Sequence, residues 1–412
     1  MQWLPFLILT WLLVGFAVAA WYARKTVLSL WREATLKQAV LIIESDDWGA
    51  GPLEQARQLD RIARVLASHR NHGGQKPVMT LGVVLGVPDG ARMVSEGLSR
   101  YYRKSLDHAD FGPVILAMKR GVESGVFALQ LHGGEHYWPQ ALLTAAKKLP
   151  TIAAWLANSV LPETETLPAP LQSRWIDASQ LPSEPLDARE VALEAEREIR
   201  FFTQVFGSTP VVAVAPTFVW NDVVENAWAR NGIKVVVTPG CRYIARDANG
   251  KLVAERRAIL NGEQGAAGIT YLVRDEYFEP CRGHRAGRGL EALARKAALA
   301  RPLLLETHRS NFLGATNADM ALGELDRLLT IAREAFPRLL FMSSEALARR
   351  IQDHDPELIE MRISVRIHIW LRRLWAVSRV RKLAWLTGMI VPGCVLYLCT
   401  RPRSPDAAFG AS

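Results

Sequence analysis

Short apolar runs typical of β-strands recur along the middle of the chain, and stretches with helical periodicity separate several of them. The helical stretches include Glu54 to Ser68 and Asp187 to Phe206. Runs such as AVLIIE and LLLE are apolar at nearly every position, as a parallel sheet covered on both faces requires. We expect strands at Ala39 to Glu44, Val78 to Leu85, Val126 to Leu131, Val211 to Ala215, Lys234 to Thr238, Ile269 to Val273, Pro302 to Glu306 and Leu339 to Met342.

This alternation predicts an α/β fold in which helical crossovers join parallel strands. Seven or eight such strands suit a single distorted (β/α) barrel, which we place at residues 37–355. Residues 137–185 interrupt the rhythm, because they are rich in Pro and Trp and longer than a crossover needs. We interpret them as an inserted loop region that forms one wall of any site at the carboxyl ends of the strands.

The N-terminal end is strongly hydrophobic. Residues 3–22 form an uncharged run of twenty, the length that crosses a hydrocarbon core about 30 Å thick, with Trp and Tyr at its ends. A cleaved signal peptide is the alternative, with Ala17-Val18-Ala19 as its cleavage site. We favour a transmembrane anchor at residues 1–24, because the run is long for a signal core and no Lys or Arg precedes it.

The C-terminal tail, residues 356–412, is basic. It carries nine Lys or Arg and three Asp or Glu, and therefore most of the net charge of +9. Its arginines alternate with Ile, Leu and Trp and lead into an apolar run at residues 383–400, which favours a membrane surface over a nucleic acid as partner. That run could span, re-enter or lie on the membrane, and basic residues on both of its sides leave the membrane face open.

Composition narrows the protein class further. The chain has 412 residues, of which 49% are hydrophobic and 22% charged, which excludes a disordered or collagen-like chain. Four Cys with no CxxC spacing exclude a disulfide-built scaffold and a zinc ribbon.

Polar clusters follow three of the expected strands. Ser45-Asp46-Asp47-Trp48-Gly49 follows the first strand, His132-Gly133-Gly134-Glu135-His136 the third, and Thr307-His308-Arg309-Ser310-Asn311 the seventh. Parallel strands end at the same edge of a sheet, so these clusters should converge. Two adjacent buried carboxylates repel each other unless positive charge lies beside them, and a metal ion is the simplest source.

This inventory suits metal-assisted hydrolysis. One carboxylate and two neutral imidazoles can hold a divalent ion and leave positions open for water and a carbonyl oxygen. A second carboxylate can accept the proton of the water, and a further imidazole can protonate the leaving group.

The motifs SDDWG and HGGEH and a His after a late strand follow one another along the chain. In their residues and their order they resemble the motifs of the NodB-homology polysaccharide deacetylases, carbohydrate esterase family 4. The resemblance covers roughly residues 37–350 and leaves both hydrophobic ends outside it. It implies a NodB-like barrel that acts on a glycan, with Asp46 as general base and His308 as general acid. It also implies Asp47, His132 and His136 as ligands of a divalent metal ion, for which zinc is the first choice.

The chain departs from the family at the third motif, where an Arg normally orients the base. The nearest match, Val214 to Phe218, has no Arg. Arg274, Arg282, Arg285 and Arg309 are the candidates for that task, and the sequence does not choose among them. We expect Asp275 and Glu276 to be partners of the acid His308.

Other interpretations stay open. Asp46-Asp47 could be a turn or a helix cap, and the paired histidines could bind nothing. His132 to His136 matches the H-x-x-E-H string of some metalloproteases, but that motif needs a helix and this segment follows a strand and contains two glycines. Trp48, Trp138 and Trp220 could stack on sugar rings or simply pack in the core.

The sequence therefore predicts a metal-dependent carbohydrate deacetylase anchored in a bacterial inner membrane. Its expected substrate is an N-acylated (acetyl or formyl) envelope polysaccharide or lipid-linked saccharide. The alternatives are a glycoside hydrolase and a non-catalytic glycan-binding membrane protein. The oligomeric state is open.

Overall fold

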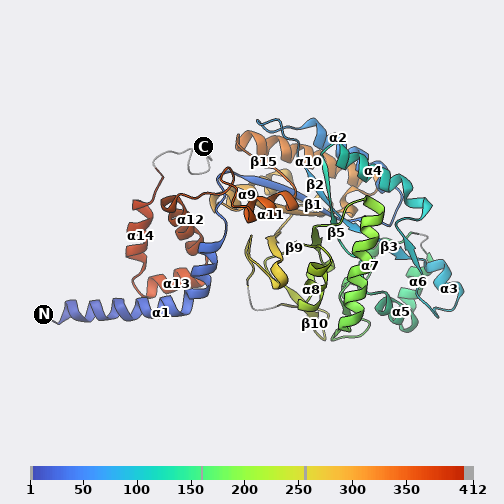
Figure 1. Cartoon of the computed structure of the whole chain (residues 1–412), viewed down its shortest axis with the longest axis horizontal. Coiled ribbons are helices and arrows are strands. Elements are labelled where there is room, and N and C mark those ends of the chain that lie inside the picture. Colours follow the sequence, from blue (N-terminus) through green and yellow to red (C-terminus); the bar gives the residue numbers. More distant parts are fainter. Residues whose placement is uncertain (1–2, 159–160, 255–257, 403–412) are drawn as a thin grey trace.

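The computed structural model describes residues 3–158, 161–254 and 258–402 (Figure 1). Its centre is a nine-stranded sheet with parallel pairing throughout. Its strands are β1 (Val40–Gly49), β2 (Met79–Val84), β5 (Phe127–Leu131), β8 (Val212–Val214), β9 (Val235–Thr238), β12 (Thr270–Val273), β13 (Glu276–Tyr277), β14 (Leu303–His308) and β15 (Leu340–Phe341). Eight of them are the strands expected from the sequence, and β13 is an addition. The α/β class with a parallel sheet is confirmed.

The sheet curls toward a barrel. The strand order is β12-β9-β8-β5-β2-β1-β14-β13, with β15 beside the start of β1. The two edge strands, β12 and β13, are consecutive in the chain, and only Arg274 and Asp275 separate them. Because so short a link spans at most about 11 Å, the opposite edges must lie close together. The carboxyl ends of β1, β5 and β14 therefore surround one opening, here called the mouth, and their amino ends form the base.

Helices cover the outside of the sheet. They are α2 (Gln55–Ser68), α4 (Gly112–Glu123), α7 (Ala188–Phe206), α8 (Asp222–Arg230), α9 (Ala286–Ala298), α10 (Ala315–Ala335) and α11 (Ser344–Gln352). The predicted helices 54–68 and 187–206 are confirmed, with Glu54 and Asp187 as their N-cap residues. Asp187 accepts hydrogen bonds from the backbone N–H groups of Arg189 and Glu190, which satisfies free donors of the first turn of α7.

The inserted region 137–185 is folded rather than a plain loop where the structure describes it. It contains α5 (Pro139–Lys148), α6 (Pro150–Asn158) and the two-stranded β6 (Ile176–Asp177) and β7 (Glu184–Pro185). Leu142, Leu156 and Leu171 belong to a small apolar core separate from that of the barrel. Two antiparallel strand pairs follow the carboxyl ends of β2 and β9 in the chain: β3 (Gly86–Pro88) with β4 (Arg103–Ser105), and β10 (Tyr243–Arg246) with β11 (Leu252–Ala254). The short helix α3 (Gly90–Ser95) lies between β3 and β4 in the sequence.

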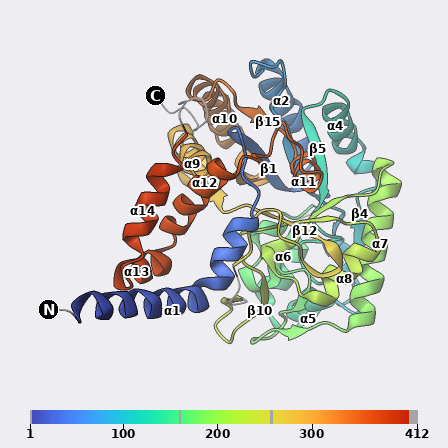
Figure 2. The same cartoon turned by 60° about the vertical axis from the view of Figure 1, so that its left-hand side comes forward.

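Both hydrophobic ends are helical. The N-terminal run lies in α1 (Leu4–Arg32), and the tail forms α12 (Ile363–Ala376), α13 (Ser378–Leu386) and α14 (Ile390–Cys399). Figure 2 shows these four helices grouped beside the barrel. Within the described ranges no single helix has both the length and the apolar composition of a membrane span, whereas α13 and α14 together do, with a bend of 113°. Residues 1–2 of the predicted anchor and 403–412 of the predicted tail lie outside the described residues.

Candidate active site

Two adjacent carboxylates of β1, Asp46 and Asp47, both lie at the mouth. In a regular strand, neighbouring side chains point to opposite faces. Here Asp47 has a left-handed backbone with a φ of 73°, and the pairing of β1 with β2 shifts register between Ser45 and Trp48. This local irregularity, which resembles a β-bulge, lets each carboxylate join a polar cluster at the mouth.

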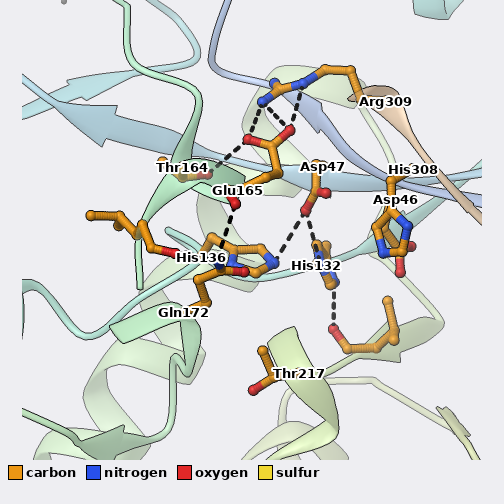
Figure 3. Close-up of polar contacts among 12 residues, drawn as sticks. Asp46, Asp47, His132, His136, Thr164, Glu165, Gln172, Thr217, His308 and Arg309 are labelled. Atoms are coloured by element: carbon orange, nitrogen blue, oxygen red, sulfur yellow. Dashed lines mark hydrogen bonds and ion pairs between the residues drawn. The ribbon is translucent and has the colours of Figure 1, made fainter. Parts of the chain in front are cut away.

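Asp47 meets both imidazoles of the HGGEH segment (Figure 3). Its Oδ1 lies 3.3 Å from His132 Nε2 and 3.2 Å from His136 Nε2, and the ligand atoms of the three residues lie within 4.8 Å of one another. Gly133, with a φ of 109°, makes the turn after β5 that returns His136 to the mouth. The structure thus brings together the three residues expected to hold a metal ion.

The chemistry of these donors fits a divalent cation. His132 Nδ1 lies 2.9 Å from the carbonyl oxygen of Val214, which can only accept, so Nδ1 carries the proton. In the neutral ring, Nε2 then directs a lone pair toward the Asp47 carboxylate, an arrangement that repels unless a cation lies between them. Two nitrogens and one oxygen form the donor set of many catalytic zinc sites.

The same two imidazoles also bear on the charge of Asp47. Burial would raise the pKa of Asp47, but the neighbouring His136 and His132 outweigh burial and hold that pKa well below its usual value. The carboxylate is therefore ionised at neutral pH and available as a ligand.

Asp46 is held by Arg274, which answers the question of which arginine orients it. Arg274 Nη2 donates to Asp46 Oδ2 at 2.6 Å, and Nη1 donates to Glu44 Oε2 at 2.8 Å. Arg274 Nε lies 3.3 Å from Glu306 Oε2. Although burial acts in the opposite direction, Arg274 lowers the pKa of Asp46 below its usual value. The other candidates lie elsewhere: Arg282 and Arg285 are exposed, and Arg309 binds Glu165.

Gly82 of β2 leaves the space that Asp46 occupies. A Cβ atom at position 82 would overlap Asp46 Oδ1 and lie 3.2 Å from the Asp46 Cα. The small residue is therefore required by the close approach of the two strands at this point.

His308 ends β14, opposite Asp46 in the register of the sheet. Its Nδ1 lies 2.7 Å from Glu279 Oε1, and Asn311 Nδ2 donates to Glu279 Oε2 at 2.5 Å. Burial would lower the pKa of His308, but the hydrogen bond to Glu279 and the charges of Asp47 and Glu306 raise it to about 10. His308 is therefore protonated at neutral pH, as a general acid must be.

The prediction that Asp275 and Glu276 are partners of His308 is wrong. Asp275 lies 2.5 Å from Lys296 Nζ and Glu276 lies 2.9 Å from Arg295, so both face α9 outside the barrel. The residue that performs this role, Glu279, lies three positions later. It reaches the mouth because the short strand β13 runs parallel to β14 and ends beside it.

The inserted region does form a wall of the site, as expected. Glu165 makes hydrogen bonds of 2.7 and 2.8 Å with Arg309 Nη2, and its backbone carbonyl accepts from Gln172 Nε2. Figure 3 shows Glu165 between Arg309 and the histidines. Because Arg309 directly follows His308, this partly buried ion pair connects the insertion to the acid side of the mouth.

Two alternative interpretations of the motifs do not fit the geometry. Glu135 lies in a turn and binds Arg103 and Arg174, so the H-x-x-E-H string does not form the helix that a metalloprotease needs. Trp48 and Trp220 pack in the core of the barrel, and Trp138 is only 8% exposed, with Arg174 over its ring, so none of the three offers a free face to a sugar.

Comparisons with known proteins leave the family open. No family model and no curated protein matches the chain. Among solved structures it is similar to a 4-alpha-glucanotransferase from Thermococcus litoralis (TM-score 0.38, 9% identity), with 84% of this chain and 46% of that chain covered.

A putative polysaccharide deacetylase from Mycobacterium smegmatis has a TM-score of 0.38 at 10% identity, covering 79% of this chain and 94% of that one. A carbohydrate esterase family 4 pseudoenzyme from Bacillus anthracis has a TM-score of 0.34 at 10% identity, covering 73% and 63%. At these TM-scores the similarities establish neither a family nor an activity.

Proposed function

We propose that this chain is a metal-dependent hydrolase that removes an N-acyl group from a sugar. The observation that carries the proposal is the convergence of Asp47, His132 and His136 within 4.8 Å, beside a carboxylate held by Arg274 and an imidazole held by Glu279. The glycan as substrate class rests on the resemblance of the SDDWG and HGGEH motifs to carbohydrate esterase family 4.

The residues divide the reaction between them. Asp47, His132 and His136 would hold the ion, for which zinc is the first choice. When bound, the ion polarises the acyl carbonyl and stabilises negative charge on its oxygen. Asp46, kept ionised by Arg274, accepts a proton from the attacking water.

His308 completes the step. The water oxygen forms a bond to the acyl carbon, the C–N bond breaks, and His308 gives its proton to the leaving nitrogen. A free amine and a carboxylic acid result. Glu279 keeps His308 protonated and oriented by its contact with Nδ1.

Release of acetate from N-acetylated chito-oligosaccharides by the purified full-length chain tests the proposal. We expect release that requires added divalent metal and falls by about a hundredfold or more in Asp46→Asn, which keeps the shape but cannot accept the proton. Asp60→Asn, on the exposed face of α2, is the matched control. New reducing ends would indicate a glycosidase, and binding without acetate or formate release would indicate a glycan-binding protein; either result contradicts the proposal.

A further inference from the structure

The helices at the two ends of the chain pack together as one unit, here called the helical module (α1, α12, α13 and α14). The tail runs back along α1: Trp31 contacts Trp370, Thr26 accepts from Arg379, and Gly15 lies against Thr387. The apolar part of α1 therefore lies at the same level as the start of the apolar segment 383–400.

The helical module is attached at the base of the barrel. Arg373 of α12 is 1% exposed and donates to four backbone carbonyls, those of Leu299, Glu33, Ala34 and Ala300, at 2.9–3.0 Å. These four residues lie three to seven positions before the first residues of β1 and β14, the strands that carry Asp46, Asp47 and His308 to the mouth. Arg301 adds two hydrogen bonds to Glu33 at 2.7–2.8 Å.

The mouth lies at the opposite end of the same strands. From Val40 to Asp47, β1 rises about 23 Å at roughly 3.3 Å per residue. Strand tilt shortens this distance along the barrel axis. From the length and tilt of β1, the metal ligands are separated from the helical module by about 20 Å of barrel.

The surface of the helical module is apolar and basic. Among the residues whose exposure the structure describes, the large hydrophobic side chains that are at least half exposed lie at residues 3–28 and 361–398, apart from Leu116 and Leu193. Residues 1–32 and 361–402 contain eleven Lys or Arg and no Asp or Glu.

The apolar and the basic side chains of the helical module lie at different distances from the barrel. Arg24 and Lys25 follow the apolar part of α1, and the contact between Thr26 and Arg379 brings the basic start of α13 beside them. Apolar side chains, then basic side chains, then the barrel is the order expected where a protein meets an anionic bilayer.

We infer that a bilayer containing anionic phospholipid covers the helical module and that the mouth faces away from it. If the proposed function holds, on which this consequence rests, the enzyme acts on sugars held well above the membrane, in a polymer or at the far end of a lipid-linked chain. The polar headgroup layer is only about 5–8 Å thick, so a sugar attached directly to a lipid phosphate lies too low to reach the mouth.

Native cysteines mark both ends of the molecule and allow a test that needs no activity. Cys394 is exposed on α14, and Cys281 is exposed beside Asn311, which contacts the partner of His308. The full chain carries one fluorophore, at Cys394 or at Cys281, with the other three cysteines replaced by Ser, and is mixed with phosphatidylglycerol–phosphatidylcholine vesicles whose acyl chains carry bromine.

We expect the protein to float together with the vesicles. The label at Cys394 should lose most of its fluorescence, whereas the label at Cys281 should keep its fluorescence. Quenching at both positions would show that the mouth lies at the bilayer and would overturn the inference. Quenching at neither position, or failure to float, would overturn the assignment of the bilayer to the helical module.

A second experiment tests the consequence for the substrate. Full-length protein is bound to the same vesicles without bromine and is given three substrates that contain N-acetylglucosamine. The first is a soluble chito-oligosaccharide, and the second is a lipid with the sugar directly on its phosphate. The third is a lipid that carries the sugar beyond a rigid spacer of roughly 30 Å, which is longer than the estimated rise of β1. We expect acetate from the first and third, and release from the second slower by about a hundredfold, the scale that misplacement of a substrate produces. Equal rates on both lipids overturn the inference and leave the proposed function intact, whereas no acetate from any of the three contradicts the proposed function.

Discussion

Two buried arginines lie at opposite ends of the barrel, and their hydrogen-bond partners differ in kind. At the mouth, Arg274 contacts the carboxylates of Glu44, Asp46 and Glu306. At the base, Arg373 donates to four backbone carbonyls, and the Glu33 carboxylate, which accepts its hydrogen bonds from Arg301, lies 3.4 Å away. Carboxylates titrate and can accept protons, whereas carbonyls only hold a donor in place. The same side chain therefore sets the protonation of a reacting group at one end and fastens two parts of the fold together at the other.

The largest effect on activity is expected when Arg274, but not Arg373, is replaced by Met. Arg274→Met removes the charge that keeps Asp46 ionised, so kcat/KM should fall by about a thousandfold or more. It also leaves buried carboxylates without a partner, which costs about 3–5 kcal/mol in the free energy of unfolding. Rates of acetate release and urea unfolding measure the two effects.

Arg373→Met should lower stability without lowering activity. It should lower the free energy of unfolding, because four backbone carbonyls lose one donor each and the buried Glu33 loses a positive neighbour, at about 1–3 kcal/mol for each buried group left unsatisfied. The kcat/KM of the folded protein on a soluble substrate should stay near that of the unaltered chain. Equal loss of activity in both variants would contradict the division of roles between mouth and base.

Gly82→Ala tests the space around Asp46 without changing any charge. The added methyl group would overlap Asp46 Oδ1, so the carboxylate must move, and kcat should fall by about a hundredfold. Gly323→Ala is the matched control, because a Cβ there meets nothing within 4 Å. An unchanged kcat in the Gly82 variant would show that the position of Asp46 does not matter.

Glu279→Gln tests the electrostatics of the acid. The pKa of His308 is raised to about 10, so the imidazole stays protonated below that pH and loses its proton as the pH rises through it. Removing the carboxylate lowers this pKa, and the alkaline limb of the kcat/KM profile should therefore move to lower pH. Glu276→Gln, which loses only a contact with Arg295, should leave the limb in place.

The smallest effect is expected at the wall. Glu165→Gln keeps the shape of the contact with Arg309 but removes its charge, which loosens the insertion beside the mouth. KM should rise a few-fold while kcat changes little, as steady-state kinetics can show. A large fall in kcat with an unchanged KM would instead place Glu165 in the chemical step.

Strand positions and polar clusters could be predicted because each depends on local pattern. Buried parallel strands are apolar along their whole length, and their carboxyl ends meet at one edge, so Asp47, His132 and His136 were placed together correctly. The sequence did not show that Arg274 rather than Arg309 orients Asp46. The position of Arg274 depends on the curl of the sheet that brings β12 and β13 together.

Other contacts left no sequence signal. Glu279 was missed because β13 has only two residues and no periodicity, and the left-handed backbone of Asp47 departs from the alternation that a strand pattern assumes. The ion pair of Glu165 with Arg309 joins residues 144 positions apart, and a pattern read along the chain carries no record of such a pair.

Metal content tests the central claim most directly. Full-length protein, the double variant His132→Ala/His136→Ala and the control His108→Ala, whose side chain is half exposed at the surface, are each dialysed against zinc and analysed for bound metal. The account predicts one ion per chain in the unaltered protein and the control, and none in the double variant at the same folded fraction. Equal zinc in all three proteins would contradict it.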